Sequence, residues 1–143
     1  RGTPRKLGAK GEEQSKVVYR LIEAEQYRGR QVLVVGGGDS ALEAALEVSD
    51  ADGTVVTLSY RGRAFDRVKP KNRARLEEAV ENCRIRQILE STVKEIEPGR
   101  VVLARGEETV ELPNDAVIVC AGGELPTPML KKIGIQVDTR YGT

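Results

Sequence analysis

A glycine-rich segment after the first long apolar run holds the residues best suited to bind an anion. Its members are Gly36, Gly37, Gly38, Asp39, Ser40 and Ala41, and they match the pattern G-x-G-x-x-G/A. In that pattern Gly36 permits a tight turn, Gly38 lets a pyrophosphate lie against bare backbone, and Ala41 is small enough for close packing of helix on strand. Exposed amides and the positive end of a helix dipole would hold the anion. We interpret Asp39 as a cap that points back at the amides of its own helix, because a carboxylate repels a pyrophosphate.

A second candidate group lies about twenty residues further on, where dinucleotide sites usually carry an acid for the adenosine ribose. The segment 58–63 reads Leu-Ser-Tyr-Arg-Gly-Arg and contains no acid. Arg61 and Arg63 are suited to grip a 2′-phosphate, and Tyr60 or an arginine plane could lie against the adenine. The sequence therefore favours NADP(H) over NAD(H).

More basic residues follow on the predicted helix that comes next. We interpret Arg73 and Arg75 as part of its solvated face, on which Arg73 pairs with Glu77 one turn later.

The elements around these groups follow a strand–helix–strand–helix pattern. Residues 32–35 are an apolar run typical of a strand buried on both faces, and residues 54–58 form a second one. An amphipathic helix follows the glycines, and another begins at Pro70 with an inner stripe that reaches Cys83. This order predicts a parallel sheet. Residues 17–22 fit either a helix or an extended segment.

The period of the pattern changes to two in the second half of the chain. Short strands are expected at 92–96, 100–104 and 108–112. They would form an antiparallel meander in place of a crossover helix, and residues 115–120 would return as a buried strand that ends in Ala121, Gly122 and Gly123. The predicted fold is α/β: a Rossmann-like, three-layer parallel sheet with a small antiparallel β-meander crossover.

Composition excludes several other kinds of chemistry. The 143 residues include 23 Lys and Arg, 22 Asp and Glu, two Cys and no His. Histidine-based nucleophile pairs are therefore excluded, and a structural zinc site is not expected. A net charge of +1 provides no global attraction to nucleic acid or to an anionic membrane. We expect no catalytic side chain and no metal ligand, so that any catalysis depends on a bound cofactor.

The two cysteines and the apolar runs indicate the cellular setting. Cys83 and Cys120 form no C-x-x-C pair, and we interpret both as buried, inert thiols in a reducing cytoplasm. The apolar runs are far shorter than the ~20 residues that span a bilayer. No signal peptide is evident, although the chain begins with Arg1 rather than Met.

Taken together, the motifs resemble the NADPH-binding domain of the thioredoxin reductase-like, FAD-dependent pyridine nucleotide-disulfide oxidoreductases. Residues 34–41 resemble that family's V-G-G-G-[ND]-[ST]-A, residues 56–62 its V-T-L-x-H-R-R, and residues 121–126 its A-x-G-x-x-P-N. Gly62 replaces the second arginine, so Arg63 would have to substitute for it. The family's C-x-x-C is missing, because Tyr19 and Ile22 stand at the matching positions. The resemblance thus implies the dithiol-free branch, which includes ferredoxin-NADP reductase-like and bacilliredoxin reductase-like flavoproteins.

The resemblance also implies a function and a domain arrangement. NADP(H) would present its nicotinamide, flanked by Ala121, Gly122 and Gly123, for hydride transfer to FAD bound mainly outside this chain. The expected divisions are a connecting arm (1–30), the NADP(H)-binding domain (31–126) and a connection back towards the FAD domain (127–143). Expected partners are that FAD domain and a protein electron acceptor such as ferredoxin or a thiol-redox protein, and a homodimer stays open. The alternatives are a non-catalytic NAD(P)-sensing module and, more distantly, a methyltransferase that binds S-adenosylmethionine.

Overall fold

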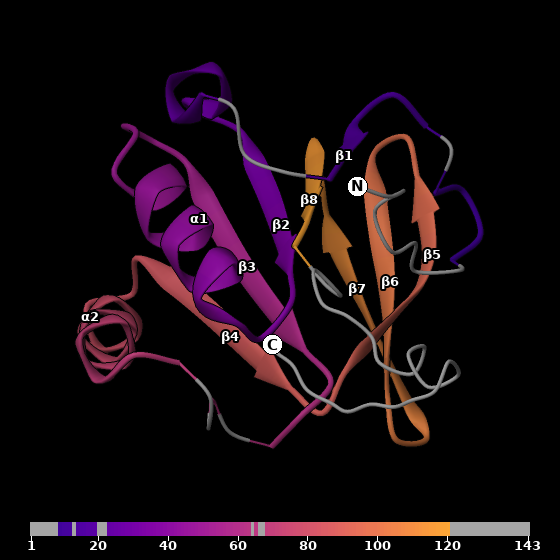
Figure 1. Ribbon diagram of the computed structural model, residues 1–143. Helices are drawn as coiled ribbons and strands as arrows, with labels where there is room; N and C mark the ends of the chain where they lie inside the picture. The colour runs from indigo at the N-terminus through magenta and orange to yellow at the C-terminus, as the bar shows by residue number, and fades with distance from the viewer. Residues whose placement is uncertain (1–8, 13, 20–22, 64, 66–67, 121–143) are drawn as a thin grey trace, which may run out of the picture.

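A parallel sheet forms the centre of the molecule (Figure 1). The computed structural model describes residues 9–12, 14–19, 23–63, 65 and 68–120. Within these residues the sheet has five strands in the order β1-β8-β2-β3-β4. Its strands are β1 (Val17–Val18), β2 (Gln31–Val35), β3 (Val55–Tyr60), β4 (Ile85–Leu89) and β8 (Ala116–Val119). All neighbours in it pair in parallel, as the alternation of strands and helices predicts.

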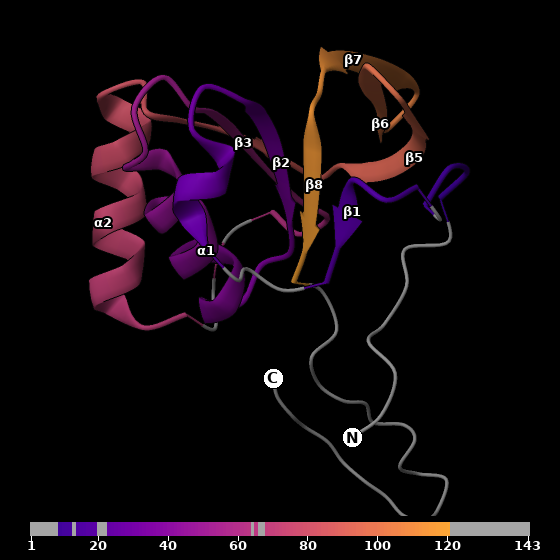
Figure 2. The same cartoon turned by 90° about the horizontal axis from the view of Figure 1, so that it is seen from above.

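Two further layers cover the two faces of this sheet. Helices α1 (Asp39–Ser49) and α2 (Pro70–Glu81) lie on one face, and a short 3₁₀ turn, η1 (Ala24–Tyr27), precedes β2. The other face carries the antiparallel sheet of β5 (Thr92–Glu97), β6 (Arg100–Arg105) and β7 (Glu108–Pro113). Figure 2 shows the helices, the parallel sheet and the meander as successive layers. The predicted fold class, including the meander between β4 and β8, is confirmed.

Both faces of β2 are buried, which explains its continuous apolar run. Val32 and Val34 belong to the core on the helix side, whereas Leu33 and Val35 belong to the core on the meander side. The four side chains are at most 8% exposed. Such burial on alternating sides is what makes a central parallel strand lack the polar–apolar alternation of a half-exposed one.

Several element ends differ from the predicted ones by one or two residues, and two of these differences affect candidate residues. β3 continues to Tyr60, two residues beyond the predicted end, and the buried Ser59 hydroxyl is satisfied there by Ser91 Oγ at 2.7 Å. α2 ends at Glu81, so Cys83 lies beyond the helix rather than on its inner stripe. Cys83 is exposed, with φ of 63°. The interpretation of Cys83 as a buried thiol is wrong, because the chain turns out of the helix before that side chain can reach the core.

The segment before β2 contributes to the fold. Of the two alternatives for residues 17–22, helix or extended segment, Val17–Val18 adopts the extended one and pairs with β8. Residues 20–22 lie outside the described residues. The Lys16 ammonium donates hydrogen bonds to the carbonyl of Glu97 and to that of Pro98 at 3.3 Å. Burial lowers the pKa of this ammonium. Lys16 thereby attaches the N-terminal segment to the meander.

Candidate dinucleotide-binding site

The candidate residues follow strands of the same parallel sheet and therefore meet at one edge. Gly36 follows β2, Arg61 follows β3 and Cys120 follows β8. β2 lies between β3 and β8. From β2 the next strands, β3 and β4, are added on one side, whereas β8 is added on the other, so the strand order reverses beside the glycine turn. Ligands of open α/β sheets bind at such a switch point, outside the carboxyl ends of the strands.

The glycine turn is tight, and its first residue has no room for a side chain. Gly36 has a φ of 141°, a conformation that side chains rarely adopt, and its N–H donates to the carbonyl of Ser59 at 3.0 Å. A Cβ at Gly36 would lie 3.1 Å from Cβ of Ala41 and 3.2 Å from the carbonyl carbon of Cys120. Ala41 is fully buried. The tight turn and the close approach of helix to strand are those that the sequence predicts.

Gly37 and Gly38 face different surroundings. A Cβ at Gly37 would stand 2.1 Å from Cε1 of the Tyr60 ring, so this glycine makes room for the tyrosine. A Cβ at Gly38 would meet no heavy atom of the described residues within 4 Å. Gly38 is also the N-cap of α1, and no side chain caps the helix there. Among the described residues the start of α1 thus has open space beside Gly38 and no side-chain cap, and uncapped helix N-termini are groups that bind anions.

Asp39 does not cap its own helix, contrary to the prediction. It is the first residue of α1, and its Oδ1 accepts hydrogen bonds from the backbone N–H of Lys69 at 2.9 Å and from Asn72 Nδ2 at 2.8 Å. These bonds, the one from Lys69 first, hold the pKa of the carboxyl below its ordinary value. The charge of Asp39 is therefore directed at the start of α2, where it accepts two hydrogen bonds, and not at the amides of α1.

Tyr60 connects the glycine turn to the arginine segment. Its ring stacks on Phe65, with 5.0 Å between ring centroids and 18° between planes. A Cβ at Gly62 would lie 2.6 Å from Cε2 of the same ring. Tyr60 therefore packs on protein groups at Gly37, Gly62 and Phe65, which orders both loops. The suggested stacking of Tyr60 on adenine stays a prediction.

Arg61 and Arg63 are both exposed beside this ring, but their partners differ. No described acid forms an ion pair with Arg61, whereas Arg63 Nε lies 3.8 Å from Oε2 of Glu90. The residues after β4 also hold the arginine segment in place, because the N–H of Glu90 donates to the Gly62 carbonyl at 3.0 Å. Sequence reasoning missed Glu90, although its position directly after the strand at 85–89 was a usable signal.

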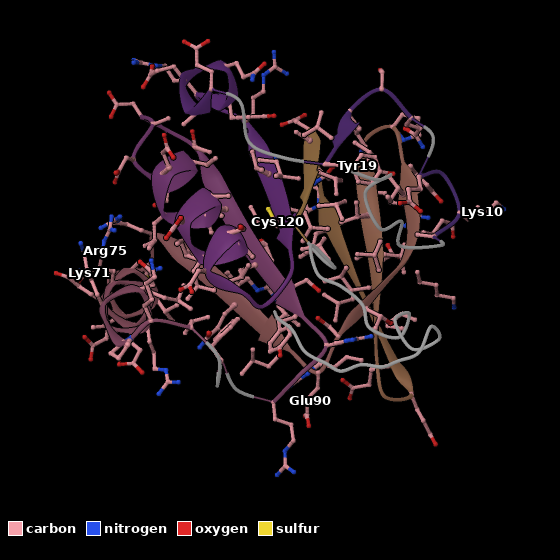
Figure 3. All side chains as sticks on the ribbon, viewed as in Figure 1. Lys10, Tyr19, Lys71, Arg75, Glu90 and Cys120 are labelled. Atoms are coloured by element: carbon pink, nitrogen blue, oxygen red, sulfur yellow. The ribbon has the colours of Figure 1, made fainter. Side chains whose placement is uncertain are left out.

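The cations of α2 are arranged partly as expected. Lys71 and Arg75 project from the outer side of the helix (Figure 3), consistent with a solvated face. The expected pair of Arg73 with Glu77 is not found among the described residues. Arg73 instead donates to the backbone carbonyl of Phe65, because a carbonyl within its reach offers a fixed acceptor whereas Glu77 is solvated. Arg73 therefore helps to hold the loop that carries the Tyr60–Phe65 stack.

Two other titratable groups stand at this edge without offering redox or nucleophilic chemistry. The backbone of Cys120 lies beside Gly36, and burial raises the pKa of the Cys120 thiol, which is labelled in Figure 3, to about 11. Tyr19, which the family resemblance matches to a cysteine of the missing dithiol, donates to Glu12 Oε2 at 2.8 Å. Burial and that hydrogen bond raise the pKa of Tyr19 to about 12. Both groups stay protonated near neutral pH.

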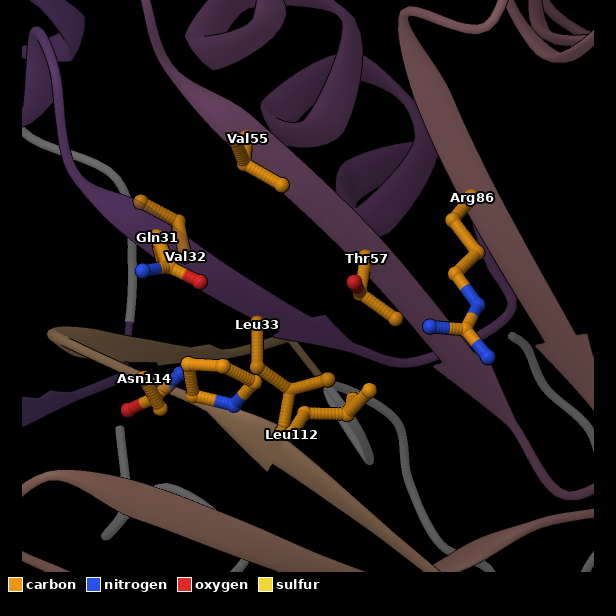
Figure 4. Close-up of a pocket in the computed structure, with 9 residues that line it drawn as sticks. Gln31, Val32, Leu33, Val55, Thr57, Arg86, Leu112 and Asn114 are labelled. Carbon is orange, nitrogen blue, oxygen red and sulfur yellow. The ribbon is translucent and has the colours of Figure 1, made fainter.

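Some predicted features lie elsewhere or outside the described residues. Ala121, Gly122 and Gly123 belong to the undescribed part. A hollow of about 110 Å³ lies between the meander and the amino-terminal halves of β2, β3 and β4, lined by Leu33, Thr57 and Arg86 among others (Figure 4). It is at the opposite edge from the glycine turn. In the described segments no three His, Cys, Asp or Glu side chains gather as for a metal ion, and no helix has the length and apolarity to cross a membrane.

The observed geometry fits a dinucleotide. Among the described residues Gly38 has open space beside it, and Asp39 directs its carboxylate to α2. Arg61, which directly follows the neighbouring strand β3, has no acidic partner among the described residues. An anion at the turn would meet donors and a helix dipole, and a second anion could reach a guanidinium.

Comparison with known proteins agrees with this geometry. The family model for pyridine nucleotide-disulphide oxidoreductases matches residues 2–142. Bacilliredoxin reductase Bdr of Bacillus subtilis is 33% identical over 141 residues, which cover 97% of this chain and 43% of that protein. A ferredoxin–NADP reductase of Ignicoccus hospitalis is 31% identical, covering 95% of this chain and 45% of its own length. The structure of bacillithiol disulfide reductase Bdr from Bacillus cereus matches with a TM-score of 0.80 at 32% identity, over 83% of this chain and 37% of that one.

The matches extend along nearly the whole chain but along less than half of each relative. The TM-score of 0.80 shows that this chain shares its fold with the matched part of the solved structure. This chain belongs to the pyridine nucleotide-disulphide oxidoreductase family.

Proposed function

We propose that this chain is the NADP(H)-binding domain of a flavin-dependent reductase and that it presents the nicotinamide to FAD held by another part of the same protein. The observation that carries the proposal is the uncapped amino terminus of α1 at Gly38, directly after the turn at Gly36 and next to the arginine segment. The chain spans 43% and 45% of two reductase relatives, which leaves room in such proteins for a flavin domain. The proposed binding domain is 31–126, with 1–30 and 127–143 as its connections, and the first of these also supplies β1 to the sheet and Tyr27 to the core.

Each part of the site has a defined task in this proposal. The amides of the glycine turn, with Ser40, hold the pyrophosphate, and Ala41 keeps the helix close enough for its dipole to act. Arg61 and Arg63 bind the 2′-phosphate with charge-assisted hydrogen bonds. Tyr60 keeps the turn and the arginine segment at a constant separation, because its ring contacts both. Ala121, Gly122 and Gly123 flank the nicotinamide end.

The chemistry itself comes from the cofactors. When bound, the nicotinamide supplies a hydride to the flavin. No side chain of this chain is assigned as acid or base, because a hydride moves without a proton carrier. Tyr19 and Cys120 stay protonated near neutral pH, so neither replaces the missing dithiol.

The names of the relatives bear on the electron acceptor. One is a bacilliredoxin reductase and another a ferredoxin–NADP reductase. We assign the parent protein an acceptor of these kinds, a thiol-redox protein or a ferredoxin, reached from the flavin rather than through a dithiol of this domain. The free cysteines Cys83 and Cys120 suit the reducing cytoplasm in which such acceptors work.

A titration with coenzymes tests the assignment. Arg61→Ala combined with Arg63→Ala should weaken NADPH binding by about tenfold or more, since a charged hydrogen bond contributes about 1.5–3 kcal/mol. NADH, which has no 2′-phosphate, should lose less than about threefold in affinity. Arg75→Ala on the outer side of α2 is the matched control and should change neither. Equal losses for both coenzymes, or binding of neither by the unchanged chain, would contradict the proposal.

A further inference from the structure

Glu90 is an acid at the arginine segment that the family resemblance does not account for. It is the first residue after β4, the neighbour of β3, and its carboxylate is exposed. Oε2 of Glu90 lies 3.8 Å from Nε of Arg63, and no other described cation lies within ion-pair distance of that carboxylate. One of the two candidate cations for a 2′-phosphate therefore has an anion beside it already.

The position of Glu90 is determined by the backbone. Its N–H donates to the Gly62 carbonyl at 3.0 Å, and the next N–H, of Ser91, donates to the Tyr60 carbonyl at 3.1 Å. Ser91 is buried, and its hydroxyl bonds Ser59. Glu90 has a φ of 56°, in the left-handed region that a glutamate seldom adopts. These contacts hold the residue against the arginine segment whether or not its side chain pairs with Arg63.

A phosphate bound by Arg63 in its present position would lie near Glu90, because the carboxylate is 3.8 Å from Nε of the guanidinium. Arg63 would either break its ion pair with Glu90 or interact with two anions at once. Both reduce the binding free energy that the phosphate gains from Arg63. A ribose 2′-hydroxyl carries no charge and avoids this cost. We propose that Glu90 is a specificity-determining residue that lowers the preference of this site for a 2′-phosphorylated nucleotide over a 2′-hydroxyl one. The inference rests on the proposed NADP(H) site.

The adenosine half of the coenzyme provides the sharpest probe. We compare binding of 2′,5′-ADP and 5′-AMP to this chain and to Glu90→Gln, which removes the charge and keeps the shape. The variant should bind 2′,5′-ADP about threefold to tenfold more tightly, the size expected for one exposed charge near a phosphate, and 5′-AMP no more tightly than before. The gain should shrink as salt is raised, because exposed charges are screened.

Two further variants guard the result. Glu47→Gln removes an equal charge at the far end of α1 and should leave both affinities unchanged. Glu90→Asn, which suits the left-handed backbone better, should repeat the gain if Glu90→Gln does not fold.

The outcomes separate this inference from the proposed function. If the unchanged chain prefers 2′,5′-ADP but neutral residues at 90 leave that preference equal or lower it, Glu90 does not oppose the phosphate and the inference is overturned, while the proposed function stands. A gain shared equally by 5′-AMP also overturns it. If the unchanged chain binds neither nucleotide, the proposed function and the inference fail together.

Discussion

Helices α1 and α2 begin near each other at the carboxyl edge of the parallel sheet, and their amino termini differ. The terminus of α1 is a bare glycine, Gly38, with open space in front of it. The terminus of α2, which we call closed, has no side-chain cap either, but the N–H of its N-cap, Lys69, donates to the Asp39 carboxylate and Pro70 at its first position has no N–H to satisfy. The chain itself thus satisfies part of one helix start, whereas the described residues leave the other open.

The difference shows how a single carboxylate serves both helices. Asp39 is in the first turn of α1, where a negative charge would compete with a bound pyrophosphate. Its bonds to Lys69 and Asn72 turn the charge towards α2 and join the two helices across a separation of about thirty residues in sequence. An acid inside a glycine-rich anion motif is therefore compatible with anion binding when a neighbouring element takes it up.

The largest effect is expected from filling the turn. Gly37→Ala places a Cβ 2.1 Å from Tyr60 Cε1, so the ring must leave its position against Phe65. Overpacking of this kind costs about 1–3 kcal/mol of unfolding free energy, and the displaced turn should lose NADPH binding. Thermal unfolding and an NADPH titration measure the two effects.

Gly38→Ala is the matched control at the open position. No atom of the described residues lies within 4 Å of the added methyl group and the backbone φ is −98°, so the unfolding free energy should change by less than about 1 kcal/mol. NADPH binding should still weaken, because the methyl group stands where the pyrophosphate would approach. Wild-type stability and affinity in Gly37→Ala would refute the role given to the Tyr60 contact.

A smaller effect is expected from opening the closed terminus. Asp39→Ala removes the acceptor for the Lys69 amide and for Asn72 Nδ2, and loss of a cap costs about 1 kcal/mol of unfolding free energy. The affinity for NADPH should not fall, since the carboxylate is directed away from the turn. Urea unfolding and coenzyme titration of the same sample check both. A tenfold loss of affinity with unchanged stability would place Asp39 at the ligand instead.

Low pH should reduce the contribution of Asp39 to the free energy of unfolding. Its pKa is lowered in the folded chain, so its contribution to stability is fully present above the unfolded value of about 3.9 and is lost as the pH falls through the folded value. The difference in unfolding free energy between wild type and Asp39→Asn should therefore shrink as the pH is lowered below about 4. Urea unfolding at several pH values measures it. A difference that stays constant over this range would mean that the carboxylate charge contributes nothing.

The open terminus could be predicted from the sequence, and the closed one could not. A buried run at 32–35, three glycines at 36–38 and Ala41 all lie within one short segment, so local sequence pattern is enough to identify strand, turn and helix. The closed terminus depends on Asp39 meeting Lys69, and the Arg63–Glu90 pair likewise joins loops that follow different strands. Such contacts depend on how neighbouring strands align, and they produce no periodic pattern in the sequence. For the same reason the fold class was predictable, whereas the partners of Asp39, Arg63 and Arg73 were not.

The smallest effect concerns the second carboxylate at Asn72. Nδ2 of this buried side chain donates to Asp39 Oδ1 at 2.8 Å and to Glu43 Oε2 at 3.0 Å. Glu43 is exposed, and without it Asn72 still donates its hydrogen bond to Asp39. Glu43→Ala should therefore lower the free energy of unfolding in urea by only about 0.3 kcal/mol. Removing both carboxylates leaves a buried amide without these two acceptors, so the double variant should cost more than the sum of the single ones. If Glu43→Ala alone lowered the unfolding free energy as much as Asp39→Ala, the closed terminus of α2 would not depend on Asp39 in particular. Asp39 would then not explain the difference between the two helix starts.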